Sequence, residues 1–271
     1  MSADDSLDDP RAVWRSGSYA VLGDWFSDAS REVLSGTDAP LGLAGRDVLD
    51  VACGTGAVAI EAARRGARVT GLDLTPELLT TAEQRASAAG VDVTLVEGSY
   101  DDLGGVGAFD VIASSFGVMF ADDPHAVATQ LAGACRPGGT VAIAAWHRDG
   151  AFGGPPASLR ALLPPARVDA SRWAEAEHVA GFFAGTGLTV ADARRASHPI
   201  PFASPEAAVE AFLTHSGSWM SMFDALTAKR EPADIRAELA ANLAKRSDPT
   251  ADGIALRAEY SVIHLGTSPH G

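Results

Sequence analysis

The stretch VLDVACGTGAVAI, residues 48–60, indicates a buried strand, a glycine-rich loop and the start of a helix. The spacing Gly54-x-Gly56-x-x-Ala59 fits the G-x-G-x-x-G/A pattern of dinucleotide-binding loops, whose backbone amides hold a pyrophosphate. Asp50 disagrees with that interpretation, because a carboxylate beside a phosphate costs roughly 1–4 kcal/mol per charge pair at about 4 Å. The stretch therefore predicts either a dinucleotide site or a site for a ligand that carries a positive charge.

Strand and helix patterns alternate around this loop. Short runs rich in Val, Ile and Ala predict parallel strands that are covered by helices on both faces. In such a sheet the ligand crevice lies at the carboxyl ends of the strands. The predicted strands are 46–52, 67–74, 91–98, 109–117 and 136–146, and the predicted helices are 57–66, 75–90 and 122–135.

The alternation stops after residue 146. A loop with one short helix is expected over 148–169, helices over 171–187, 204–230 and 232–248, and strands over 188–202 and 253–267. Residues 204–230 contain a possible break at 216–218, and residues 11–36 also have a helical pattern. We expect a single domain with a core over 37–146 and 188–271 and cap elements over 11–36, 147–187 and 204–230.

Composition narrows the class of protein. The 271 residues carry a formal net charge of -14, which argues against a nucleic-acid footprint and against binding to anionic membranes. Cys53 and Cys135 form no zinc-binding pattern, so we expect no metal. The acidic start lacks the apolar run of a signal peptide, and no stretch reaches the ~18 apolar residues of a membrane span. We expect a cytoplasmic protein, monomeric or homodimeric, with a small-molecule partner.

S-adenosylmethionine is a ligand with the required charge. It has an ammonium, a sulfonium, a carboxylate and a ribose, and no phosphate. The loop amides can take its carboxylate, and Asp50 can favour its ammonium directly or through water. Asp73, at the end of the second predicted strand, can take the ribose hydroxyls, although it would also suit the ribose of a dinucleotide. A strand-end or helix-capping role is the structural alternative for Asp50 and Asp73.

Four ordered motifs now support one family. LDVACGTG, GLDLTPELL, FDVIASSFGVMF and CRPGGTVAIAAW together resemble the class I S-adenosylmethionine-dependent methyltransferases. The ubiquinone/menaquinone-biosynthesis-type branch is the most similar, and it includes many small-molecule methyltransferases of bacterial secondary metabolism, such as antibiotic biosynthesis. WRSGSYAVLGDW also resembles that branch. The resemblance covers residues 13–146 well and 147–271 only loosely.

The resemblance implies an α/β fold, a Rossmann-like, mostly parallel sheet of seven strands with an antiparallel last strand. It places Asp73 at the ribose and Leu74 against the adenine, and Ser99 stands where the family usually has an acidic residue. Trp14 and Tyr19 are candidates to close over the donor. The full set of cofactor-binding candidates is Trp14, Tyr19, Asp50, Ala52, Cys53, Gly54, Gly56, Asp73, Leu74, Ser99, Tyr100, Ser115 and Phe116.

Methyl transfer needs mainly alignment and exclusion of water, and a general base only where the acceptor loses a proton. His147, directly after the fifth strand, is the first candidate base, and His215 is the second. Each could instead be a structural or surface histidine. The candidates for an apolar acceptor pocket, which could equally be core residues, are Met119, Phe120, Trp146, Phe152, Trp219 and Met222.

The sequence therefore predicts transfer of a methyl group to an O, N or C atom of a small aromatic or apolar acceptor. The first alternative is an NAD(P)-dependent oxidoreductase that uses the same loop. A second is a binding protein that keeps the fold without turnover. A third is a hydrolase, because ASSFG at 113–117 is a variant of the nucleophile elbow with Ser115 as nucleophile. That last alternative leaves Asp50 and Asp73 without a role.

Overall fold

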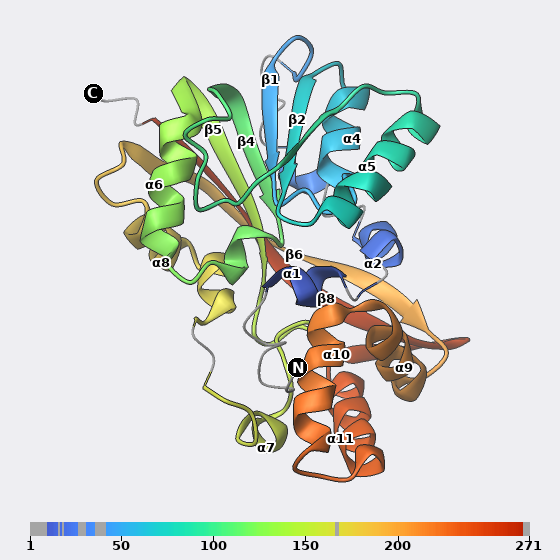
Figure 1. The fold of residues 1–271 in the computed structure, drawn as a ribbon. Coiled ribbons are helices and arrows are strands. Elements are labelled where there is room, and N and C mark those ends of the chain that lie inside the picture. The colour runs from blue at the N-terminus through green and yellow to red at the C-terminus, as the bar shows by residue number, and fades with distance from the viewer. Residues whose placement is uncertain are drawn as a thin grey trace. The chain divides into compact units, whose positions relative to one another are not determined.

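A computed structural model describes residues 10–15, 17, 19–26, 31–35, 42–165 and 168–267. Its main feature is one mixed sheet (Figure 1). The described strands are β1 (Asp47–Val51), β2 (Arg68–Asp73), β3 (Thr94–Glu97), β4 (Phe109–Ser115), β5 (Cys135–Trp146), β6 (Leu188–Phe202), β7 (Ser247–Thr250) and β8 (Gly253–Thr267). The strand order is β3-β2-β1-β4-β5-β8-β6, and β7 pairs with β8 outside this path.

Helices connect the strands. Those described are α1 (Pro10–Arg15), α2 (Tyr19–Trp25), α4 (Ala57–Arg64), α5 (Pro76–Ala89), α6 (Pro124–Ala134), α7 (Ala157–Arg160), α8 (Ala176–Phe182), α9 (Pro205–His215), α10 (Gly217–Thr227) and α11 (Pro232–Ala244), with the 3-10 helices η1 (Val118–Phe120) and η2 (Ala170–Ala174). α9 and α10 separate at Ser216, which confirms the expected break. None of the helices in the described ranges combines the length and apolar character that a membrane crossing requires.

Local sequence signals set several of these boundaries. α5 begins with Pro76 in its first turn and ends at Gly90, whose φ of 68° is a left-handed conformation that glycine adopts without strain. α6 begins after Asp123, whose side chain accepts from two backbone amides of the first turn. α9 begins after Ser204, whose hydroxyl accepts from the amide of Ala207 at 3.2 Å. These ends agree with the predicted ones to within two residues.

The parallel half of the sheet has the expected two-sided cover. β1 pairs in parallel with β2 and β4, β2 with β3, and β4 with β5. Val48, Leu49, Asp50 and Val51 are all buried, as expected for a central strand between two helical layers. Figure 1 shows α4 and α5 to one side of these strands and α6 and α8 to the other. The predicted α/β class with a mostly parallel sheet is confirmed.

The antiparallel strand β8 lies between β5 and β6 in the sheet. Its register pairs Trp146 with Tyr260 and Thr140 with Gly266. The seven expected strands are present, and β7 adds an eighth among the described residues. β7 has the sequence Ser-Asp-Pro-Thr, which has little strand propensity, so only its hairpin with the start of β8 makes it a strand.

The described residues fall into two compact units. The first contains those within 1–25, 148–167 and 197–259, and the second those within 26–147, 168–196 and 260–271. The second unit thus holds β1 to β5 with α4, α5, α6 and α8, whereas the first holds α1, α2, α7 and α9 to α11. α8 was expected in the cap and α11 in the core. The single domain with its cap boundaries stays a prediction, and residues 27–30 and 36–41 lie outside the described ones.

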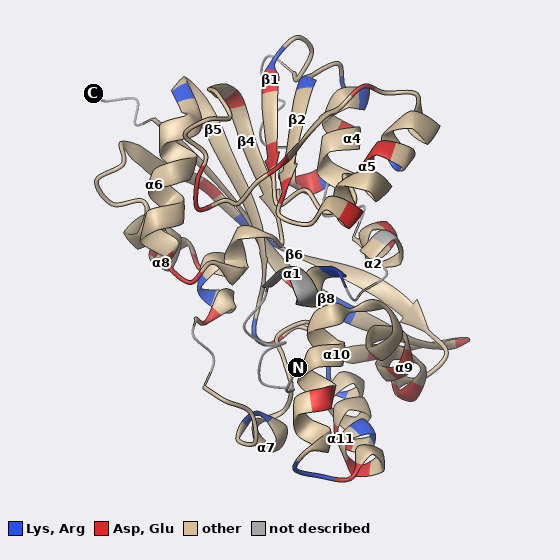
Figure 2. Cartoon of the chain, in the orientation of Figure 1, with Lys and Arg blue, Asp and Glu red and all other residues tan. Residues whose placement is uncertain are grey.

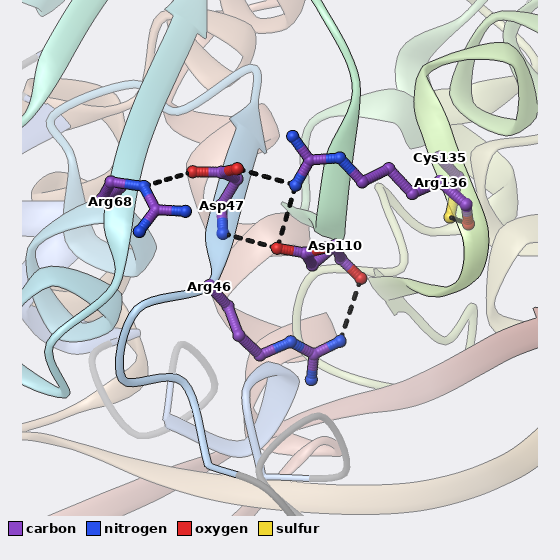
Figure 3. Close-up of polar contacts among 6 residues, drawn as sticks. All are labelled: Arg46, Asp47, Arg68, Asp110, Cys135 and Arg136. Carbon is purple, nitrogen blue, oxygen red and sulfur yellow. Dashed lines mark hydrogen bonds and ion pairs between the residues drawn. The ribbon is translucent and has the colours of Figure 1, made fainter.

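A network of five charged residues crosses the edge of the sheet where the parallel strands begin (Figure 3). Asp47 is 2.6 Å from both Arg68 Nε and Arg136 Nη1. Asp110 accepts from the amide of Asp47 at 2.8 Å and lies 3.0 Å from Arg136. Arg46 donates to the carbonyl of Asp110 at 3.2 Å. The hydrogen bonds from Arg68 and Arg136 lower the pKa of Asp47. We call these five residues the basal charge network.

Candidate active site

The glycine loop connects β1 to α4 at the opposite edge of the sheet. Three of its residues have left-handed backbone conformations: Ala52 with a φ of 56°, Gly54 with 53° and Gly56 with 81°. Glycine adopts this conformation freely, whereas alanine does so at a cost. The amide of Cys53 donates to the carbonyl of Leu72 at 2.9 Å, which ties the loop to the end of β2. The predicted loop is therefore a sharply turned segment against two strand ends.

Asp50 lies at the end of β1 and is 1% exposed. Its carboxylate accepts from the amide of Ala59, in the first turn of α4, at 2.9 Å. This contact is the helix-capping role that the sequence left open, and the positive end of the helix favours a negative charge there. Burial nevertheless raises the pKa of Asp50 to about 8, since water is excluded, and the nearby Asp73 raises it further.

Asp73 ends β2 and is 7% exposed. One carboxylate oxygen accepts from the amide of Gly54 at 2.8 Å, and the other accepts from the amide of Thr75 at 2.9 Å. The Thr75 side chain and the amide of Leu74 also contribute hydrogen bonds that favour the charged form of Asp73. Burial raises the pKa of Asp73 as well, and within the described ranges no Lys or Arg side chain contributes to the pKa of either carboxylate. The edge thus holds two buried acids whose pKa shifts arise from burial, hydrogen bonds and mutual repulsion rather than from a cation in the described part of the chain.

The other predicted adenine contacts follow β2 and β3. Leu74 is partly buried beside Asp73. The Ser99 hydroxyl donates to Asp101 at 2.8 Å and accepts from the amide of the same residue, so it is engaged in a local turn. Tyr100 is partly buried, and its pKa is raised to about 12 by burial and by nearby acids that include Asp73. Tyr100 thus interacts electrostatically with Asp73, the candidate for the ribose contact, whereas Ser99 bonds within its own turn.

A cavity of about 430 Å³ opens beside Ser99, on the face of β2 and β3 that carries Leu72 rather than Asp73. None of residues 52–56 of the glycine loop lines it. Its lining consists of Thr70, Leu72, Thr94, Val96, Glu97, Gly98, Ser99, Asp102, Gly105 and Val106.

The end of β4 packs directly on the glycine loop. Ser114 Oγ donates to the carbonyl of Val51 at 2.8 Å. A Cβ atom on Gly117 would lie 2.4 Å from the Cβ of Ala52, so only glycine allows this approach. Ser115 and Phe116 lie between these two contacts in the sequence, and their place near donor and acceptor stays a prediction. η1 follows, with Met119 buried and Phe120 38% exposed.

Four aromatic rings gather where β4 and β5 end, beside the middle of β8, and we call them the aromatic cluster. Phe116 and Trp146 stack face to face, with ring centroids 3.5 Å apart and an interplanar angle of 1°. Phe26 meets Trp146 edge-on at 4.9 Å, and Tyr260 meets it edge-on at 5.9 Å. Phe116 and Trp146 are among the candidates that the sequence predicts, whereas Phe26 and Tyr260 are not, because neither belongs to a motif.

His147 is 8% exposed and follows β5. Its Nε2 lies 2.7 Å from Ser261 Oγ, and its Nδ1 lies 3.9 Å from a carboxylate oxygen of Glu175. A carboxylate on that side favours the tautomer with hydrogen on Nδ1, which leaves Nε2 to accept from the Ser261 hydroxyl. Neither Ser261 nor Glu175 had a sequence signal, since they meet His147 only through the pairing of β8 with β5 and through η2.

The remaining candidates belong to the first unit and are described within it. Trp14 and Tyr19 have ring centroids 5.8 Å apart, and the Tyr19 hydroxyl accepts from the amide of Gly217 at 3.0 Å. His215 lies edge-on to Trp25 at 6.1 Å, and its buried Nδ1 has no hydrogen-bond partner among the described residues. The acceptor candidates of this unit are Phe152, Trp219 and Met222, of which the first two contact the ring of Phe212.

Part of the chain is similar to known proteins. Residues 48–139 match the family model described as a methyltransferase domain. An uncharacterised protein of Mycobacterium tuberculosis is 36% identical over 184 residues, which is 66% of this chain and 66% of that protein. The chain thus spans just under two thirds of that relative's length.

Two further similarities are more distant or shorter. The ubiquinone biosynthesis O-methyltransferase of Escherichia fergusonii is 36% identical over 111 residues, 40% of this chain and 46% of that enzyme. The crystal structure of a putative methyltransferase from Bacillus halodurans C-125 has a TM-score of 0.57 at 14% identity, and the match covers 88% of this chain and 98% of that one. At that identity the structural match shows the fold alone.

The family match extends from β1 into the first residues of β5, so it includes the glycine loop, Asp73 and Phe116. It supports the expected methyltransferase domain and S-adenosylmethionine as the cofactor. The branch of the family, the acceptor and the role of each site residue stay predictions.

Proposed function

We propose that this chain transfers a methyl group from S-adenosylmethionine to an O, N or C atom of a small aromatic or apolar acceptor. The observation that carries the proposal is the pair of buried acids, Asp50 and Asp73, on both sides of the glycine loop. A phosphate ligand would add negative charge beside two buried acids and so disfavour the ionised form of both. A ligand with an ammonium and a sulfonium would instead favour their ionised form.

The residues present suit that donor. The Asp73 carboxylate would accept from the two ribose hydroxyls, and Leu74 would lie against the adenine. The left-handed turns at Gly54 and Gly56 allow the backbone to approach the methionine end closely. The donor itself supplies an activated methyl group, whose transfer leaves a neutral thioether. The work of the protein is to hold the two reactants in line and to exclude water.

A base is required only when the acceptor atom carries a proton that must leave. His147 is our candidate, and its Nε2 contacts Ser261. The Ser261 hydroxyl would therefore either turn away or pass the acceptor proton to Nε2 in that step. A general base acts only when it is unprotonated, so replacement of His147 by alanine is expected to remove the acidic limb of a pH–rate profile for an acceptor that loses a proton. An unchanged profile would remove His147 as the base.

Calorimetry tests the donor class. Titration with S-adenosylhomocysteine, the neutral-thioether product, is expected to give saturable heat, whereas NAD is expected to give none. Saturable binding of NAD without a response to S-adenosylhomocysteine would overturn the proposal in favour of an oxidoreductase. Incubation with S-adenosylmethionine labelled in its methyl group, together with extracts of the source organism, then identifies the acceptor by mass. Binding without any labelled product would indicate a binding protein.

A further inference from the structure

We propose that a planar aromatic ring of the acceptor displaces the Phe116 side chain and stacks in its place on the face of Trp146. This inference rests on the proposed methyl transfer, because it concerns the acceptor of that reaction. It specifies the acceptor class as a molecule with a planar aromatic ring. Three independent features of the second unit support it.

The first feature is the backbone of Phe116. Its φ of 59° lies in the left-handed region, which bulky non-glycine residues rarely adopt. Such a conformation persists only where surrounding contacts enforce it, and it is typical of residues that move or bind at functional sites. The amide of Phe116 donates to the carbonyl of Ala144 at 2.9 Å, so the end of β5 holds the backbone in place.

The second feature is the stack itself. Aromatic pairs favour offset or edge-to-face arrangements, with centroids about 4.5–7 Å apart, over a face-to-face sandwich. Phe116 and Trp146 instead overlap almost completely, at 3.5 Å and 1°. Both the backbone and the ring geometry of Phe116 are thus unfavourable for an isolated phenylalanine. We infer that the surrounding contacts favour an aromatic ring at this position.

The third feature is that the position has walls. Phe26 and Tyr260 approach the Phe116 ring edge-on, at 5.7 and 5.8 Å, and both also approach Trp146 edge-on. Any planar ring on Trp146 would therefore find the same two edges beside it. Glu32 interacts with the Tyr260 side chain by a hydrogen bond, which fixes that wall. An aliphatic group would lose these quadrupolar contacts.

Contacts within the chain also place this position close to the glycine loop. Gly117, the next residue, is the one that packs against Ala52. A ring that displaces Phe116 would therefore lie beside the loop at which we place the methyl donor. This proximity is what in-line transfer requires of an acceptor site.

The test uses 2-naphthol as a planar probe and decahydro-2-naphthol as its non-planar match, each titrated into protein saturated with S-adenosylhomocysteine. Phe116→Gly empties the position and suits the left-handed backbone, so we expect 2-naphthol to bind at least tenfold tighter than to wild type. Trp146→Leu in that background is expected to reduce the affinity at least tenfold, whereas Trp146→Phe keeps a ring and most of the affinity. Decahydro-2-naphthol is expected to bind at least tenfold more weakly than 2-naphthol.

Phe182→Leu is the matched control, because Phe182 is a buried ring of the same unit that contacts Trp173 rather than the aromatic cluster. It should leave 2-naphthol binding unchanged. Equal affinity in wild type and Phe116→Gly, equal affinity for both probes, or no binding to Phe116→Gly overturns the proposed ring site. Failure of wild type to bind S-adenosylhomocysteine would instead overturn the proposed function, and titrations without it would still report on the ring site.

Discussion

Asp47 and Asp50 lie at opposite ends of the same strand, β1, and their surroundings differ in kind. Asp47 is bound by Arg68 and Arg136 in the basal charge network, and their hydrogen bonds lower its pKa. Asp50 is buried beside a second acid, and burial raises its pKa to about 8. Figure 2 shows red and blue segments together at the edge where β1 and β2 begin. The protein thus balances its own charges at one edge and, on our proposal, leaves the other edge for a cationic ligand.

The largest effect is expected from Asp73→Asn. The substitution keeps the shape but removes the charge that accepts from Gly54 and, on our proposal, from the ribose. Affinity for S-adenosylhomocysteine should fall about 100-fold, which corresponds to about 2.7 kcal/mol, as measured by calorimetry. Asp110→Asn makes the same change in the basal charge network and should leave that affinity within about twofold of wild type. Equal losses of affinity in both variants would contradict the proposal that only the edge with Asp73 binds the donor.

The next effect concerns pH. Because the folded-state pKa of Asp50 is raised above its unfolded value near 3.9, the folded protein holds a proton between about pH 4 and pH 8 that the unfolded chain has lost. The free energy of unfolding should therefore fall as pH rises through that window and level off above it. Asp50→Asn removes this dependence and should unfold at a temperature several degrees above wild type at pH 8.

Asp47 provides the opposite sign. Its lowered pKa contributes stability that is present above the unfolded value and is lost as pH falls through the folded one. Asp47→Asn should therefore unfold at a lower temperature than wild type at pH 8. Thermal melts of the two variants from pH 4 to pH 9 measure both signs. A wild-type midpoint that rises steadily from pH 5 to pH 8 would contradict the assignment for Asp50.

A smaller effect is expected from Ser261→Ala, because Ser261 and His147 hydrogen-bond to each other and need no ligand. The variant leaves the buried Nε2 of His147 without its partner at 2.7 Å, and the melting temperature should fall by about 2–4 °C. Affinity for S-adenosylhomocysteine should not change. Ser158→Ala removes an exposed hydroxyl that donates to Glu238, so its melting temperature should match wild type within about 1 °C. Matching losses would mean that burial of the His147 pair is unimportant.

The smallest effect is expected from Ala52→Gly. Relief of the left-handed conformation at Ala52 should offset the extra chain entropy of glycine, so the melting temperature should rise by no more than about 2 °C. Ala63→Gly, in the last turn of α4, has no strain to relieve and should cost up to about 1 kcal/mol of unfolding free energy. Urea unfolding compares the two. A loss of equal size at Ala52 would show that its conformation is not strained.

The sequence predicted the strands and helices of the parallel half well, because buried strands and capped helices are set by local pattern. It also identified Asp50 and Asp73, since both follow from the position of the glycine loop. It did not predict that Asp50 caps α4, because that depends on which way one side chain turns after the strand ends. It missed β7, whose residues become a strand only through pairing with β8.

Contacts between distant segments were the other limit. Phe26 and Tyr260 are more than 200 positions apart, yet both rings meet Phe116. Ser261 reaches His147 only because β8 aligns antiparallel to β5 in one register. No period or motif in a single segment encodes such a meeting. These are also the residues that our inference about the acceptor uses.

The place of β8 in the strand order has a consequence for synthesis of the protein. β5 and β6 are made earlier in the chain, yet β8 must enter between them before the sheet is complete. Until residues 253–267 leave the ribosome, β5 keeps an unpaired edge that includes Val141 and Ile143, both buried in the finished protein. Nascent chains shorter than this are expected to aggregate or to require a chaperone, so the last strand is the step that commits the chain to its fold.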